Sequence, residues 1–130
     1  MSPLLLSLAL FAAAPQAEPS DHRLNEFPEA FRGTWAEELK TCGTEYRHNH
    51  VKITADGAAF YEIFGELISA VWLSENVLRT DFVMFEHVET WTDTHTWRLV
   101  NGGRALTWEK SGVTPVVLWR CPSDRSQSLY

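Results

Sequence analysis

The chain has 130 residues and a formal net charge of -6 at pH 7, and 22% of its residues are charged. This acidic balance disfavours nucleic acid and anionic membranes as partners. No apolar run reaches the about 20 residues that a membrane-spanning helix requires, and a chain of this length supports one domain around one core.

The N-terminal segment reads as a secretory signal, because an apolar run from Leu4 to Ala14 is followed by small residues up to Ala17. We expect residues 1–17 to be a signal peptide that is cleaved. Residues 18–23 and the Ser-rich residues 123–130 are expected to be a disordered spacer and a disordered tail. One folded domain over residues 24–122 then remains, located in the periplasm or secreted to the medium.

After this segment the sequence alternates β-rich runs with short polar breaks. Apart from one turn of helix expected over residues 24–31, no segment shows a 3.6-residue apolar period. A first strand is expected near Trp35. Further strands are expected over residues 48–54, 58–64, 66–73, 76–85, 89–100, 104–110 and 114–121. Gly-containing breaks at residues 56–57, 65, 101–103 and 111–112 mark turns, and another reversal is placed at residues 86–88.

About eight short strands with close connections predict an all-β fold, a small up-and-down antiparallel barrel whose closure removes exposed sheet edges. Strand alternation predicts which side chains of residues 89–100 point inward. The inner set is Trp91, Asp93, His95, Trp97 and Leu99. The outer set is Thr92, Thr94, Thr96 and Arg98. Leu106 and Trp108 are also expected inside, and at the last strand either Val116 and Leu118 or Val117 and Trp119.

The two cysteines bracket the predicted barrel, Cys42 after the first strand and Cys121 at the end of the last. The first and last strands of such a barrel are neighbours, so one disulfide between the two would staple its closure. Two free thiols or an intermolecular bond are the alternatives. No CxxC spacing points to a metal or catalytic use.

The segment Phe31-Arg32-Gly33-Thr34-Trp35 resembles the Gly-x-Trp signature that opens the first strand of lipocalins. In that family a late Arg packs over the Trp. The resemblance therefore implies a cation–π contact between Arg120 and Trp35, with Gly33, Trp35 and Arg120 as structural residues. The Thr-Asp-Tyr motif of lipocalins is echoed by Thr80-Asp81-Phe82 or by Thr92-Asp93-Thr94.

The chain is also similar to short exported bacterial proteins of no assigned activity. The shared order is Phe-x-Gly-Thr-Trp, a nearby Cys, Phe60-Tyr61-Glu62, Glu89-Thr90-Trp91-Thr92 and a terminal Arg-Cys-Pro. This resemblance implies the fold and the exported location, and it implies no particular chemistry.

Catalysis and metal binding find little support in the residues. Ser69, Ser74 and Ser111 lack the context of a catalytic nucleophile. Glu62 and Glu66 suit solvated strand ends. His48 and His50 share a strand face with Lys52 and Thr54, so they are expected to point to solvent rather than to hold a metal. We expect neither an enzyme nor a cofactor.

Six tryptophans are more than an average small core requires. The first hypothesis is a binding protein that holds a small apolar or aromatic ligand inside the barrel. Its ligand-binding residues would be Trp72, Trp91, Asp93, His95, Trp97 and Trp108. The alternative is a cell-envelope interaction module or hydrolase inhibitor that acts through the barrel loops, with a protein partner and a packed interior. Space around His95 would favour the ligand, whereas an exposed apolar loop patch would favour the partner.

Overall fold

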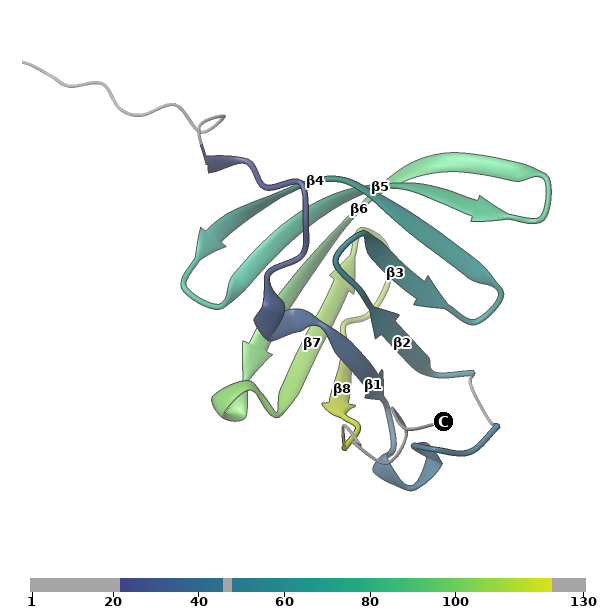
Figure 1. Ribbon diagram of the computed structural model, residues 1–130, viewed down its shortest axis with the longest axis vertical. Coiled ribbons are helices and arrows are strands. Elements are labelled where there is room, and N and C mark those ends of the chain that lie inside the picture. Colours follow the sequence, from purple (N-terminus) through teal and green to yellow (C-terminus); the bar gives the residue numbers. More distant parts are fainter. Residues whose placement is uncertain (1–21, 46–47, 123–130) are drawn as a thin grey trace, which may run out of the picture.

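The computed structural model describes residues 22–45 and 48–122 and contains one closed antiparallel barrel of eight strands in chain order (Figure 1). The strands are β1 (Gly33–Ala36), β2 (His50–Ile53), β3 (Gly57–Phe60), β4 (Ile63–Ser74), β5 (Val77–Glu86), β6 (Glu89–Val100), β7 (Ala105–Lys110) and β8 (Val116–Arg120). β1 pairs with both β2 and β8. The predicted fold class is confirmed. The expected signal peptide, the tail and most of the spacer lie outside the described residues.

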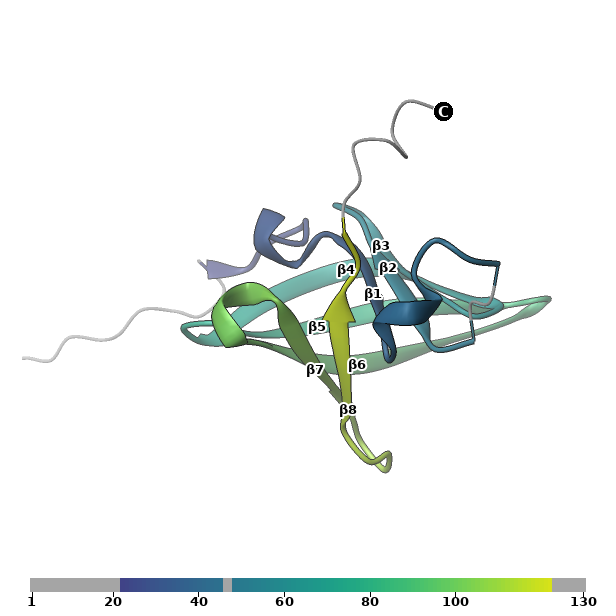
Figure 2. The ribbon, with the colours of Figure 1, turned by 90° about the horizontal axis from the view of Figure 1, so that it is seen from below.

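The long strands β4, β5 and β6 form one side of the barrel, and Figure 2 shows them running side by side. The reversal expected at residues 86–88 is present, since β5 ends at Glu86 and β6 begins at Glu89. His87, in the turn, has a φ of 57°. Short 3-10 helices within the described residues are η2 (Glu29–Phe31) before β1, η3 (Leu39–Thr41) between β1 and β2, and η4 (Asn101–Gly103) between β6 and β7.

The sequence prediction of one turn is wrong, and the prediction of a helical turn before the first strand holds only in part. The turn expected at Gly65 lies instead at Tyr61 and Glu62, where Glu62 has a φ of 63°, and Gly65 is inside β4. Gly65 is required by packing, because a Cβ there would lie 3.0 Å from both the Phe82 ring and the Met84 sulfur. The helical turn expected over residues 24–31 is reduced to η2, and Leu24 forms a β-bridge with Ala70.

The interior is filled by side chains that alternate along the strands. Its largest fully buried members are Trp35, Trp97, Phe27, Phe31, Phe82, Ile53, Leu78, Leu106, Leu118, His95 and Thr80. In β8, Leu118 is buried and Val116 packs against the core, while Val117 and Trp119 are exposed. Of the two alternatives that the sequence left open for β8, the structure therefore shows the one in which Val116 and Leu118 point inward.

One end of the barrel is plugged by the segment before β1. Phe27 and Phe31 are fully buried there, and the Trp35 indole donates a hydrogen bond to the Phe31 carbonyl over 2.9 Å. The Arg120 guanidinium carbon lies 4.2 Å from the Trp35 ring centroid, so the contact expected between these two side chains is present. Gly33, with a φ of 128°, lets the chain pass close to Arg120.

The expected disulfide joins Cys42 to Cys121 across a sequence separation of 79 residues. The backbone amide of Cys121 also donates to the Thr34 carbonyl over 2.8 Å, which extends the contact between the last strand and β1. Within residues 22–45 and 48–122, no helix is long and apolar enough to cross a membrane.

Candidate functional site at the open end of the barrel

The end opposite the plug is open, and we call it the mouth. Among the described residues, it is formed by the connections over residues 37–45, 48–49, 61–62, 87–88 and 111–115. A hollow of about 100 Å³ opens there, among the ends of β2, β3, β7 and β8. Its apolar lining is Val51, Phe60, Trp108, Val116 and Leu118, and its polar lining is Glu37, His48, Asn49, His50 and Tyr61.

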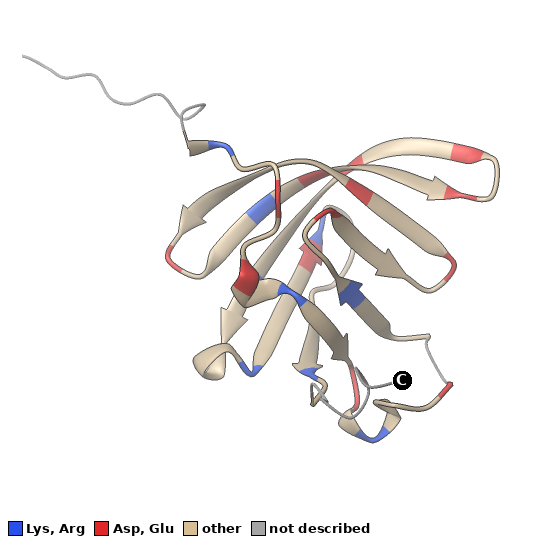
Figure 3. Ribbon diagram, viewed as in Figure 1, with Lys and Arg blue, Asp and Glu red and all other residues tan. Residues whose placement is uncertain are grey.

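A groove of about 370 Å³ adjoins the hollow and shares His50, Phe60 and Tyr61 with it. The wall that the strands β1, β2 and β3 contribute to the groove consists of Thr34, Lys52 and Ala59. The charged groups that line the hollow and the groove are Glu37, Glu45, Glu62 and Lys52. Three carboxylates against one ammonium make the region acidic, and Figure 3 shows further acidic residues at the tips of the hairpins.

The floor of the hollow is a stack of aromatic rings. Phe60 and Trp108 stack with their centroids 5.1 Å apart, and Trp108 stacks on the buried Trp97 at 6.0 Å. At the rim, His48 stacks on Tyr61 at 4.1 Å. Stacked rings of this kind bury large areas in few rotamers, so the floor is preorganised.

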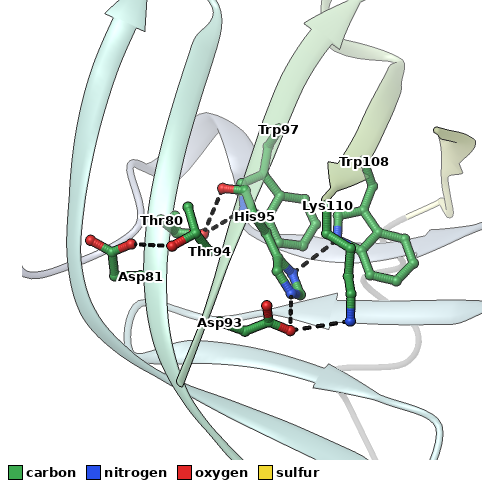
Figure 4. A network of polar contacts seen from close by, with 8 residues as sticks. All are labelled: Thr80, Asp81, Asp93, Thr94, His95, Trp97, Trp108 and Lys110. Atoms are coloured by element: carbon green, nitrogen blue, oxygen red, sulfur yellow. Dashed lines mark hydrogen bonds and ion pairs between the residues drawn. The ribbon is translucent and has the colours of Figure 1, made fainter. Parts of the chain in front are cut away.

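A chain of polar contacts lies behind this floor (Figure 4). The Trp108 indole donates to Nδ1 of His95 over 3.0 Å, and Nε2 of His95 lies 3.3 Å from Oδ2 of Asp93. The Lys110 ammonium donates to the same carboxylate oxygen over 3.1 Å. An indole nitrogen can only donate, so Nδ1 carries no proton and Nε2 carries one. His95 is therefore neutral, and its contact with Asp93 is a hydrogen bond.

The electrostatics of this chain agree with that assignment. Burial lowers the pKa of His95, while the hydrogen bond and charge of Asp93 raise it and the charge of Lys110 lowers it. The net pKa lies below the usual 6.5. Burial raises the pKa of Asp93, but hydrogen bonds from Lys110 and His95 outweigh it and hold that pKa below 3.8. The carboxylate is thus charged and the imidazole uncharged at neutral pH.

Buried polar atoms beside His95 are satisfied as well. The Trp97 indole donates to Oγ1 of Thr80 over 2.8 Å, and that hydroxyl donates to the His95 carbonyl over 3.2 Å. Because each donor has an acceptor, the strand pair β5 and β6 holds Trp97 and His95 in fixed orientations.

The residues expected to bind a ligand do not gather around one cavity. Trp97 and His95 are buried in the packed interior, and Trp91 is half-buried against it. Trp72 packs against Phe31 at the plugged end, with the two rings tilted by 47° and their centroids 5.8 Å apart. Asp93 borders a separate cavity with Thr92 and Thr94. Of the six expected residues, Trp108 is the one that lines the mouth hollow.

Sequence reasoning missed Phe60 and Tyr61 as mouth residues, because they fell inside a predicted strand. Their position at the tight turn before β4 brings them to the open end. His50, expected to face solvent, is half-buried, and its Nε2 lies 2.7 Å from the Thr41 hydroxyl. His48 is exposed. Within the described residues, no group of three or more His, Cys, Asp or Glu side chains could hold a metal ion.

An exposed apolar pair lies on the outer face of the barrel near the mouth. Phe64 of β4 is directly opposite Phe85 of β5, and these side chains are 42% and 36% exposed. Val88, at the tip of the hairpin between β5 and β6, is 95% exposed.

In comparisons with known proteins, no family model, curated protein or solved structure matches the chain.

Proposed function

We propose that the protein is an exported, lipocalin-like binding protein that holds one small aromatic or apolar group at the mouth of its barrel. The observation that carries the proposal is the hollow whose floor is the stacked pair Phe60 and Trp108, at the open end of a barrel whose other end is plugged. Apolar walls with a few polar groups at the rim are typical of small-molecule sites. The proposal assigns no catalytic role and needs no cofactor.

The size of the hollow limits the ligand. An apolar cavity of about 150 Å³ can hold benzene. The hollow, at about 100 Å³, is smaller than that but is open on one side, so a single ring is the largest group that we expect it to hold. Larger ligands would extend into the groove past His50 and Tyr61. For a ligand of one ring we expect a dissociation constant on the order of 0.1–1 mM.

The charge of the lining limits the ligand further. Glu37, Glu45 and Glu62 surround the entrance, and Lys52 is the one ammonium among the lining residues of the hollow and groove. Coulomb repulsion in this setting disfavours a carboxylate on the ligand. We therefore propose a neutral or cationic aromatic compound as the ligand class.

The exported location is part of the proposal. The Cys42–Cys121 bond is the kind of staple that persists in oxidising compartments. Together with the apolar N-terminal residues of the sequence, it supports a periplasmic or secreted protein.

The test uses three fluorinated probes of one size, followed by ¹⁹F NMR: fluorobenzene, 4-fluorobenzylamine and 4-fluorobenzoate. At neutral pH we expect saturable binding of the first two and at least about threefold weaker binding of the carboxylate. Trp108→Ala should abolish binding, whereas Trp119→Ala, which removes an exposed indole on the outer face, should leave it unchanged. An equal loss of probe binding in the Trp108→Ala and Trp119→Ala variants, or no saturable binding in the wild type, would contradict the proposal.

A second candidate function is docking of a protein partner. The packed interior and the exposed pair Phe64 and Phe85 favour it, because contiguous exposed apolar side chains commonly mark interaction sites. The double variant Phe64→Ser, Phe85→Ser separates the two functions. It should leave binding of fluorobenzene intact if the mouth is the working site, and it should abolish capture of an envelope partner if the outer face is.

A further inference from the structure

His95 and Trp108 form a contact that only the neutral imidazole can make. The indole N–H of Trp108 points at Nδ1 over 3.0 Å. A protonated imidazole carries an N–H on both ring nitrogens, and an indole nitrogen accepts no hydrogen bond. Protonation of His95 would therefore set two N–H groups against each other in a buried site, and one ring must move.

We propose that His95 is a proton-operated latch of the mouth: its neutral form holds Trp108 in the floor of the hollow, and its protonation displaces that indole and releases the bound ring. The first half of this inference concerns the protein alone. The second half, ligand release, rests on the proposed function.

Trp108 is the element that moves, because its freedom is greater than that of His95. His95 is 1% exposed and is enclosed by the rings of Phe60, Phe82 and Trp97. Trp108 is only half-buried and has the hollow on one side. An indole turned away from His95 would enter the hollow, break its stack with Phe60 and occupy the space of the ligand.

The ionisable groups that act on His95 are Asp93 on its own strand and Lys110 on β7. The side chains that face it from β3 and β5 are Phe60, Phe82 and the Thr80 hydroxyl, which carry no charge. Asp93 would favour an imidazolium, but it is shared with Lys110, and burial works against the added charge. The neutral form is therefore kept at neutral pH and is lost in acid.

The direction of the device follows from this balance. The latch is closed near neutral pH and opens below the His95 midpoint, which lies under 6.5. Since only the closed form offers the hollow, the apparent dissociation constant should rise by up to about tenfold for each pH unit below that midpoint. An exported protein meets such changes directly, because the pH of its surroundings is not buffered by the cytoplasm.

The first readout needs no ligand. In the ¹⁵N-labelled protein, the two ring nitrogens of His95 and the indole N–H of Trp108 are followed by NMR from pH 8 to pH 4.5. We expect the His95 ring to show a protonated Nε2 and a bare Nδ1 at pH 8. The Trp108 indole resonance should then shift with the same midpoint as His95. An indole resonance that stays in place while His95 titrates would overturn the latch.

The second readout is the affinity for fluorobenzene, which carries no charge across this range. It should weaken in the wild type below the midpoint. His95→Gln offers an amide that can accept from Trp108 and donate to Asp93 without titrating, and it retains every other histidine. In that variant both the affinity for fluorobenzene and the Trp108 indole resonance should be independent of pH. A decrease in affinity at low pH equal to that of the wild type would contradict the proposal.

Trp108→Phe provides a second variant that keeps a ring in the floor. Without the indole donor, the neutral imidazole loses its hydrogen bond and the pKa of His95 should rise toward its usual value. An unchanged midpoint in this variant would overturn the coupling. If fluorobenzene binds at no pH, the proposed function fails, while the indole resonance still decides whether the latch exists.

Discussion

The guanidinium of Arg120 covers the ring of Trp35 at 4.2 Å and ties three backbone carbonyls together at the plugged end. Its nitrogens donate to the carbonyls of Gly103, Arg32 and Ala30 over 3.2, 2.9 and 2.6 Å. These carbonyls belong to the connection before β7 and to the segment before β1. One side chain therefore links the last strand to the plug.

Replacement of Arg120 should destabilise the whole barrel. Arg120→Met keeps much of the side-chain length but removes the cation–π contact and three hydrogen-bond donors. We expect a loss of about 2–4 kcal/mol in the free energy of unfolding, measured with urea. Arg79→Met is the matched control, because Arg79 is exposed on β5. A loss of similar size in both variants would show that the network contributes nothing specific.

Replacement of either of two closely packed glycines, Gly57 or Gly65, by alanine should lower the free energy of unfolding. A Cβ on Gly57 would clash with the carbonyl oxygen of Gly65, and a Cβ on Gly65 would meet Phe82 and Met84 at 3.0 Å. We expect Gly65→Ala to cost about 1–3 kcal/mol and Gly57→Ala to cost more. Gly102→Ala has open space around it and only a φ of 64° to strain it, so its cost should stay near about 1 kcal/mol. Thermal unfolding ranks the three, and an equal cost for all would contradict the packing argument.

These glycines also explain where sequence reasoning succeeds and fails. Alternation along β6 predicts correctly that His95 and Trp97 point inside, because the period of two is a local property of the sequence. The sequence predicts a turn at Gly65, because the ring of Phe82, which excludes a side chain there, is distant in sequence. The true turn at Tyr61 and Glu62 contains no Gly, Pro or Asn.

The same misreading hid the candidate site. With the turn displaced to Gly65, Phe60 and Tyr61 fell in the middle of a strand rather than at the mouth. The sequence did predict that Trp108 points inward, but not that it lies at the open end beside Phe60. Which tryptophans share a cavity depends on register between strands, and register between distant strands is not written in any local pattern.

The disulfide should contribute to stability through the unfolded chain. It closes a loop with a sequence separation of 79 residues, for which the chain-entropy relation gives about 4.5 kcal/mol. We expect the double variant Cys42→Ser, Cys121→Ser to unfold at a much lower urea concentration than the wild type. The reduced wild-type protein should match it. A double variant as stable as the oxidised protein would contradict this expectation.

Stability should fall in acid in two stages. The folded pKa of His95 lies below 6.5, so the unfolded state binds more protons between the two pKa values, and stability decreases as pH falls from about 6.5 through the folded pKa. Asp93, whose folded pKa lies below 3.8, adds a second decrease below that pH. Urea unfolding measured at successive pH values should lose the first stage in His95→Gln and retain the second. A first stage that persists in the variant would assign it to another group.

The most direct test of the mouth as the binding site is a ¹H–¹⁵N spectrum of the six tryptophan indole groups during addition of fluorobenzene at neutral pH. The tryptophans report on different regions: Trp35 and Trp72 on the plugged end, Trp97 on the interior, Trp91 on the part of β6 packed against the core, Trp119 on the outer face and Trp108 on the mouth. We predict that the Trp108 resonance shifts most and saturates with the ¹⁹F binding curve. A largest shift at Trp72 or Trp97, with Trp108 unmoved, would contradict the account.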